Sequence, residues 1–330
     1  MFARNTLRAW VGIVFLCAMF LLGQNTWGPP PLPRDIPDTG ITRCYDNTQE
    51  IECPSPGEAF YGQDAHYETH PLDCTDHGDG TVTDNVTGLM WQKCSAGLSG
   101  SDCSVGEAEA ATWSDAVARC PEIDLGGHQD WRLPGENELQ SLVHYGRYDP
   151  AVDPVAFPGT GSLPYWSSSL YAGHESLSWY VHFDAGHVDR EFNDTGLFPL
   201  RCVRGPRSLP SFTPNGDGTV TDNVTGLMWQ QQDDEVPRSW EDALAYCQAV
   251  HTGGHTDWRL PDIKQLKSLV DTSRHDPAID PVAFPGAQSR VYWSSSTYAW
   301  EPSGAWYVYF GLGYVGNVYK ADTYYVRCVR

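Results

Sequence analysis

The stretch GDGTVTDNVTGLMWQ occupies residues 78–92, and it recurs letter for letter at residues 216–230. Shorter identical pieces follow both occurrences in the same order: DWRLP from residues 130 and 257, YWSSS from 165 and 292, and RCVR from 201 and 327. A repeat of more than about 100 residues has the size of a whole domain, whereas the units of a solenoid span about 20 to 50 residues. The sequence therefore predicts two tandem domains of one fold.

The spacing of equivalent residues shows where the two copies differ. Asp79 and Asp217 are 138 positions apart, but Trp113 and Trp240 are only 127 apart. The first copy therefore carries 11 extra residues in between, and two of its cysteines lie in this insertion. With 13 Trp, 17 Tyr and 11 Phe among 330 residues, the chain can supply a hydrophobic core to both copies.

These observations divide the chain into five predicted parts. They are a signal peptide or N-terminal anchor at 1–27, a Pro-rich linker with a small hairpin at 28–71, a first domain at 72–204, a linker at 205–213 and a second domain at 214–330.

The first of these parts places Arg4 and Arg8 before an uncharged apolar run, residues 9–23, that is shorter than a typical membrane-spanning helix. No good cleavage site follows, so a cleaved signal and an uncleaved anchor both stay open. In either case we expect the rest of the chain to be extracytoplasmic: in the periplasm, on the outer surface or secreted. Any contact with the membrane would then be made by this segment alone.

Nine cysteines remain when Cys17 is set aside with the N-terminal segment. Two of them occupy equivalent places in each copy, two lie in the insertion, and two more precede the first domain. The predicted disulfides are Cys120–Cys202, Cys247–Cys328, Cys94–Cys103 and Cys44–Cys53. Cys74 is left over, as a free thiol or an interchain link. Zinc is disfavoured because the sequence has no Cys-x-x-Cys pair and an exported protein is in an oxidising compartment.

Each copy repeats one order of predicted elements. A hairpin with a Gly-closed turn, at 81–91 in the first copy, precedes a helix predicted at 113–120 and at 240–250. A second helix follows the Trp-Arg-Leu-Pro piece, and aromatic strands are predicted at 179–183 and 306–310. This order predicts an α+β fold with short antiparallel sheets, two helices and a long-range disulfide in each copy.

The charge of the chain argues against one class of partner. Acidic residues outnumber basic ones by 42 to 21, so the net charge is -21. No cluster of Lys and Arg offsets this charge locally, and binding to nucleic acid is therefore disfavoured. Solubility is the simplest explanation of the acidity.

Taken in order, GDGTVTDNVTGLMWQ, DWRLP, YWSSS, WYV-x-F and the terminal RCVR resemble the Lcl C-terminal domain family, over about residues 72–204 and 211–330. The Arg-Leu-Pro piece and its helix also resemble the C-type-lectin-like and formylglycine-generating-enzyme superfamily. The resemblance implies a C-type-lectin-like fold, and surface attachment or glycan binding as the function. It supplies no set of catalytic residues that could be carried over to this chain.

Aromatic residues are the candidates for ligand contacts, because a ring can stack on the apolar face of a sugar while hydroxyls and amides bind its polar edge. The predicted ligand-binding residues are Tyr171, Trp179, Tyr298, Trp300 and Trp306. Tyr171, Tyr298 and Trp300 follow the Ser-rich strand and are best placed to face a ligand. Aromatic residues within strands, Trp166 and Trp293 among them, are more often part of a core.

Four aspartates raise the question of calcium. Asp79, Asp84, Asp217 and Asp222 lie in Gly-flanked loops, and oxygen-rich loops of this kind can hold the ion. Their spacing does not fit an EF-hand, and Asp-Asn beside Gly is ordinary turn chemistry, which we favour. Apart from this calcium hypothesis, the sequence predicts no cofactor.

The sequence does not predict an enzyme. His128 and His255 follow Gly-Gly in both copies, but no nucleophile or carboxylate accompanies them at a fixed spacing. Arg132 and Arg259, with Glu138 or nearby acids, are expected to form structural ion pairs.

We therefore expect an exported bacterial binding or adhesion protein of the cell envelope that recognises carbohydrate or surface and matrix ligands. The alternative is a structural or protein-interaction component of the envelope without glycan binding. An enzyme of the formylglycine-generating type is less favoured, because the cysteines that such chemistry needs are assigned to disulfides.

Overall fold

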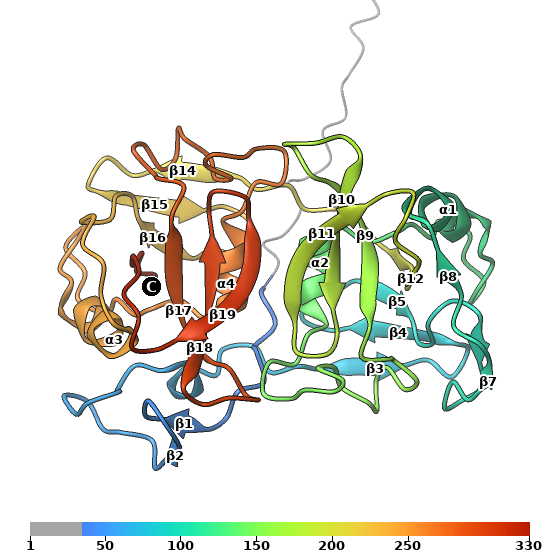
Figure 1. The fold of residues 1–330 in the computed structure, drawn as a ribbon, viewed down its shortest axis with the longest axis horizontal. Coiled ribbons are helices and arrows are strands. Elements are labelled where there is room, and N and C mark those ends of the chain that lie inside the picture. The colour runs from blue at the N-terminus through green and yellow to red at the C-terminus, as the bar shows by residue number, and fades with distance from the viewer. Residues whose placement is uncertain (1–34) are drawn as a thin grey trace, which may run out of the picture. The chain divides into compact units, whose positions relative to one another are not determined.

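Two copies of one arrangement of short strands and helices make up most of residues 35–330, the part of the chain that the computed structural model describes (Figure 1). The predicted signal peptide or anchor at 1–27 lies outside the described residues. Within the described part, no helix is long and apolar enough to span a bilayer.

The elements follow the predicted order, and the α+β class with short antiparallel strands, few helices and several disulfides is confirmed. Before the first copy come β1 (Cys44–Tyr45), β2 (Glu50–Ile51) and the 3-10 helix η1 (Asp64–His66). The first copy contains β3 (Cys74–Asp76), β4 (Thr81–Asp84), β5 (Met90–Gln92), β6 (Leu98–Ser99), β7 (Val105–Gly106), β8 (Ala110–Ala111), α1 (Trp113–Arg119), the 3-10 helix η2 (Cys120–Glu122), α2 (Glu136–Ser141), β9 (Pro164–Leu170), β10 (Leu177–His182), β11 (His187–Phe192), β12 (Phe198–Pro199) and β13 (Val203–Arg204). The second copy contains β14 (Phe212–Pro214), β15 (Thr219–Asp222), β16 (Met228–Gln230), α3 (Trp240–Ala249), α4 (Ile263–Ser268), β17 (Val291–Thr297), β18 (Gly304–Tyr309) and β19 (Tyr314–Tyr319).

The repeated 15-residue stretch forms a hairpin because its own side chains hold the turn. In the first copy, Asp84 Oδ1 accepts a hydrogen bond of 3.0 Å from the Val86 N–H, and Asp84 Oδ2 accepts one of 2.6 Å from the Thr87 hydroxyl. Gly88 closes the turn at φ +68°, in the left-handed region that glycine adopts without a steric cost. Strands β4 and β5 then pair in antiparallel register.

The helices begin at side chains that cap them. The Thr112 hydroxyl accepts from the Asp115 N–H at the start of α1, and the Ser239 hydroxyl accepts from the Asp242 N–H at the start of α3. These bonds satisfy backbone donors that have no partner inside the helix. Helices α1 and α3 therefore begin where the sequence predicts, whereas α2 and α4 are only six residues long.

A six-stranded sheet joins the two copies. Its order is β17-β18-β19-β11-β10-β9, so β9 to β11 of the first copy and β17 to β19 of the second form one continuous surface (Figure 1). The joint is the antiparallel pairing of β11 with β19, at Val188 and Val315. The two edge strands thus meet at this residue pair, which joins the sheets of the two copies.

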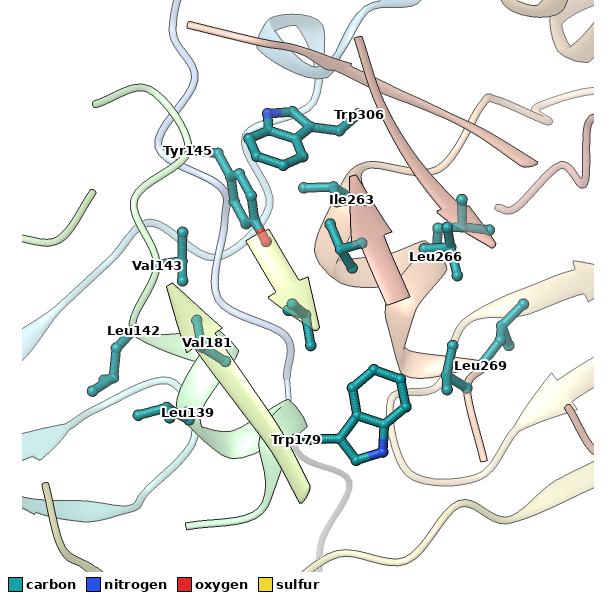
Figure 2. Packing of buried hydrophobic residues seen from close by; sticks show 14 of the residues in the cluster. Leu139, Leu142, Val143, Tyr145, Trp179, Val181, Ile263, Leu266, Leu269 and Trp306 are labelled. Carbon is teal, nitrogen blue, oxygen red and sulfur yellow. The ribbon is translucent and has the colours of Figure 1, made fainter. Parts of the chain in front are cut away.

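The largest hydrophobic core is also shared. It draws on both second helices and on the inner faces of β10 and β18 (Figure 2). Tyr145 of the first copy packs edge to face against Trp306 of the second, with ring centroids 5.0 Å apart. In Figure 2, Trp179 of the first copy points toward Leu269 of the second. The aromatic strands therefore hold the copies together.

Residues 35–71 correct one prediction, because they are a packed part of the fold and not a linker. Lys264 Nζ donates to the Asp38 carbonyl at 2.9 Å, and the Tyr145 N–H donates to the Thr39 carbonyl at 2.8 Å. Thr39 itself is fully buried. We call residues 35–71 the clamp segment, since they bind both copies.

The linker between the copies is shorter than predicted. Phe212 already belongs to β14, which pairs with β15, so the predicted linker at 205–213 runs into the second sheet. Phe212 packs edge to face on Phe284, with centroids 5.3 Å apart, and this contact draws the strand into the fold.

Four disulfides join the cysteines in the four predicted pairs. Cys120–Cys202 and Cys247–Cys328 each connect the region of the first helix to the end of the copy, across sequence separations of 82 and 81 residues. Cys94–Cys103 closes the insertion, and Cys44–Cys53 closes the hairpin of β1 and β2. Cys74 has no disulfide partner among residues 35–330.

Candidate functional site

The shared core takes two of the predicted ligand contacts out of reach. Trp179 is 0% exposed and Trp306 is 1% exposed, and the predicted role of both in ligand binding is therefore wrong. Trp166 and Trp293 are fully buried too, in agreement with the alternative that strand aromatics belong to a core. Trp179 on β10 and Trp306 on β18 are buried because these strands of the six-stranded sheet pack against the second helices, α2 and α4.

Trp300 has the opposite environment. It lies between β17 and β18 at the tip of a tight turn, in which Glu301 N–H donates to the Tyr298 carbonyl at 3.2 Å and Gly304 N–H to the Glu301 carbonyl at 2.9 Å. Its side chain is 60% exposed, although nine other tryptophans of the chain are fully buried. Trp300 is therefore held in place while its ring stays open to solvent.

A tyrosine from the other copy supports this indole. Tyr148, 48% exposed, packs edge to face against Trp300 with ring centroids 4.7 Å apart. Such contacts contribute about 0.5–1.5 kcal/mol beyond area burial. Tyr298 lies below and packs on Trp306 at 5.2 Å. We call Tyr148, Tyr298 and Trp300 the Trp300 ledge, and it needs residues of both copies.

Polar groups lie beneath the ledge. The His187 ring is 6.1 Å from that of Tyr298, and Asn317 Nδ2 is 2.8 Å from His187 Nε2. Burial lowers the pKa of His187 below its ordinary value, with the nearby Asp184 opposing this shift. Burial also raises the pKa of Tyr298, so its hydroxyl remains a neutral hydrogen-bonding group at neutral pH.

The residues that the repeat makes equivalent to the Trp300 ledge form a second site of different composition. The residues 127 positions from Tyr298, Trp300 and Tyr148 are Tyr171, Gly173 and His275. Without an indole at Gly173, a shallow cavity of about 380 Å³ remains, which we call the His275 cavity. It is lined by Ala172, Ser273, Arg274, His275, Asp276, Pro277, Ile279 and Pro281.

Tyr171 is the predicted residue nearest this cavity, but little of it is exposed. It is 9% exposed, because the Arg190 guanidinium lies 4.7 Å from its ring centroid and the His275 ring is 6.2 Å away. Of the five predicted ligand contacts, the structure thus leaves only Trp300 largely open, with Tyr298 partly open.

The four aspartates do not form a calcium site. Asp84 and Asp222 are buried and hold the turns of their own hairpins, as the turn alternative predicts. Asp79 and Asp217 each accept two bonds from the threonine two residues later. The carboxylate oxygens accept hydrogen bonds within their own turns and do not converge on one point, so these residues do not fit the calcium hypothesis.

Two cysteines and a histidine are other potential metal ligands that lie close together. Within residues 35–330, Cys44, Cys53 and His66 are the one set of three potential metal ligands whose atoms lie close together. The two sulfurs are bonded to each other in a disulfide, so they cannot act as thiolate ligands.

The Arg and His residues that recur in both copies have local partners. Arg132 forms a two-bond pair with Glu138, at 2.6 and 2.7 Å, as expected. Arg259 pairs with no acid among residues 35–330; its guanidinium donates to Gln265 Oε1 at 2.7 Å instead. His128 lies in a tight turn, where its carbonyl accepts from the Trp131 indole at 3.0 Å.

Sequence reasoning missed Tyr148 and His275, which occupy the same position of the two copies. Each is followed by Asp-Pro, so the copies align there without gaps. The sequence does show that the residue at this aligned position differs between the copies, Tyr in the first and His in the second. The meaning of this difference depends on the contact between copies, which the sequence does not show.

Comparison with known families agrees with the internal repeat. The profile of the Lcl C-terminal domain matches residues 80–204 and, separately, residues 218–330. The profile of a protein of unknown function (DUF3649) matches residues 2–23, which lie outside the described part. A search of curated proteins finds no match.

Proposed function

Because the chain belongs to the Lcl C-terminal domain family and carries two copies of the domain, we propose that it is an exported envelope protein that binds carbohydrate of a cell surface or matrix through the Trp300 ledge. The observation that carries this proposal is the exposed indole of Trp300, held against Tyr148. Within residues 35–330, nine other tryptophans are fully buried, so Trp300 stands apart as an indole whose face is open to a ligand.

The chemistry of the ledge suits a sugar ring. An indole face complements the C–H face of a pyranose, and polar groups beside it can bind the hydroxyls at the edge. Glu301 and Ser303 lie on the same turn as Trp300, and the Ser303 hydroxyl donates to Glu301 at 2.9 Å. Both side chains are exposed or partly exposed, and they can exchange this bond for bonds to a ligand.

The His275 cavity is proposed as a second, weaker contact for the same kind of ligand. It offers Arg274, His275 and Asp276 as polar groups but no exposed indole. Two contacts on one chain can raise the overall affinity about 10² to 10⁴-fold when the geometry lets both engage.

Location and fold form part of the proposal. Four disulfides suit an oxidising compartment, which supports an extracytoplasmic site in the periplasm, on the outer surface or in the medium. A lectin-like fold of each copy is supported by the disulfide between the first helix and the end of the copy. We propose no catalytic role, and the net charge of -21 makes nucleic acid an unsuitable partner.

A glycan array followed by titration of the best ligand tests the proposal. Trp300→Ala should weaken binding about tenfold or more, since one stacking contact is worth about 1.4 kcal/mol. Tyr319→Ala is the matched control, because Tyr319 is an equally exposed aromatic residue at the end of β19. The proposal fails if the folded, monodisperse protein binds no glycan, with or without calcium, or if Trp300→Ala binds as well as the native chain.

A further inference from the structure

The clamp segment covers one face of the second copy. Phe60 packs its ring on Trp240, with centroids 6.4 Å apart. The Asp64 carboxylate accepts a hydrogen bond of 2.5 Å from the Ser296 hydroxyl. Beneath these contacts, Trp240 and Ser296 have no exposed surface.

A third contact extends the same face. The Arg259 guanidinium lies 5.0 Å from the ring centroid of Tyr67, whose hydroxyl also accepts from Gln248 Nε2 at 2.9 Å. Thr297 follows Ser296 on β17 and is only 2% exposed. The clamp segment therefore contacts the second copy through the rings of Phe60 and Tyr67 and through the carboxylate of Asp64, which lies between them in the sequence.

The first copy keeps the three side chains that receive these groups. The equivalent pairs, each 127 positions apart, are Trp113 and Trp240, Arg132 and Arg259, and Ser169 and Ser296. We call Trp113, Arg132, Ser169 and Leu170 the open face.

Within residues 35–330, no counterpart of the clamp segment covers the open face, although Arg132 pairs with Glu138 and donates to the Gly205 carbonyl at 3.1 Å. Trp113, Arg132 and Ser169 are all partly exposed, whereas their counterparts are buried. Leu170 is 46% exposed at the position where the second copy has the buried Thr297. Leu170 therefore exposes an apolar side chain at a position that, in the second copy, lies in the face covered by the clamp segment.

The polar groups of the open face favour a carboxylate. The Ser169 hydroxyl accepts from the Glu136 N–H at 3.2 Å, but in the described part of the chain its own proton has no acceptor. Arg207, an exposed residue, donates to the neighbouring Ser168 hydroxyl at 3.2 Å and places a positive charge beside it. A charge-assisted bond to a carboxylate would use both groups.

We propose that the open face binds a short segment of a partner polypeptide in which a carboxylate lies between two aromatic side chains, spaced as Phe60, Asp64 and Tyr67 are in the clamp segment. The equivalent contact in the second copy carries the argument, because it shows which chemistry the retained side chains accept.

The clamp segment itself is not free to fill the open face. Lys320 Nζ donates to the Asp46 carbonyl at 2.8 Å and ties the β1–β2 hairpin to the second copy. The first copy has Asn193 in place of Lys320 and Pro121 in place of Gln248. The clamp segment therefore stays on the second copy, and an occupant of the open face does not use these two contacts.

A synthetic peptide of residues 57–70, labelled for fluorescence anisotropy, is the probe. It contains Phe60, Asp64 and Tyr67 and lacks the hairpin. With the full chain we expect saturable binding with a Kd below about 1 mM, and at least a tenfold loss when the peptide carries Asp64→Lys. The covalently attached clamp segment has an effective concentration in the millimolar range or above, so the peptide will not displace it.

Leu170→Arg in the protein should also weaken peptide binding at least tenfold, while Val155→Arg, at an exposed apolar residue of the first copy outside the open face, should not. Trp300→Ala should leave peptide binding unchanged, so this inference and the carbohydrate proposal fail separately. The inference is overturned if the native protein does not bind the peptide, if the Asp64→Lys peptide binds equally well, or if Leu170→Arg has no effect.

Discussion

A buried ion pair between α2 and α4 couples the two copies, and removing one partner should destabilise the whole chain. Lys267 pairs with Glu136, and the two side chains are 0% and 3% exposed. Lys267→Met leaves the Glu136 carboxylate buried without a cation. Loss of one partner of a buried pair costs about 3–5 kcal/mol, so the free energy of unfolding should fall by that amount.

The internal repeat supplies the compensating change. Ile263 occupies in the second copy the position that Glu136 occupies in the first, so an apolar side chain is compatible with this part of the fold. Glu136→Ile combined with Lys267→Met replaces the pair by apolar side chains of similar volume, which is often neutral or stabilising by about 1–4 kcal/mol. We therefore expect the double variant to regain most of the stability that Lys267→Met loses.

Urea denaturation, followed by both tryptophan fluorescence and circular dichroism, measures these changes. Arg204→Met is the matched control, because it removes a cation from a pair with Asp130, which is 62% exposed, and should cost no more than about 1 kcal/mol. The reasoning is refuted if the double variant is as unstable as the sum of its single changes, since the two groups would then not interact.

Three further predictions concern the disulfides, a buried carboxylate and the free cysteine. Replacing Cys247 and Cys328 together by Ala opens a loop of 81 residues and should lower the free energy of unfolding by about 4.5 kcal/mol in the chain-entropy model. The same urea denaturation measures this loss, and an unchanged midpoint would contradict the prediction. Burial raises the pKa of Asp262 to about 6, so its protonated form stabilises the fold fully below pH about 4 and this contribution is lost as the pH rises through about 6. Asp262→Asn keeps a side chain that can cap α4 and should therefore gain stability relative to the native chain between pH 4 and 7, and a difference that does not vary with pH would count against this assignment. Burial raises the pKa of Cys74 to about 12, which suppresses its thiolate, so the purified chain should migrate as a monomer on a non-reducing gel; a dimer that reductant removes would show an interchain link.

Much of the local structure follows from residues close together in the sequence. The Asp84 turn, the caps of α1 and α3 and the pairing of the cysteines were all accessible, because turns and caps use bonds over two or three residues and the repeat aligns equivalent cysteines. The candidate site was accessible only in part. Trp300 and Tyr298 could be named from their loop, but Tyr148 could not be placed beside Trp300, since these residues are 152 positions apart in different copies.

By itself, the sequence determined that the chain contains one domain twice, that its class is α+β and that its cysteines form four pairs. Repetition and short-range hydrogen bonding are properties of the linear chain, so they can be read from it. Only the tertiary structure decided that β11 pairs with β19, that Trp179 and Trp306 are buried between the copies, and that residues 35–71 cover Trp240 and Ser296 of the second copy but not the equivalent Trp113 and Ser169 of the first. These outcomes depend on which surfaces meet when two similar domains pack together, and that is settled by the complementarity of distant side chains such as Glu136 and Lys267.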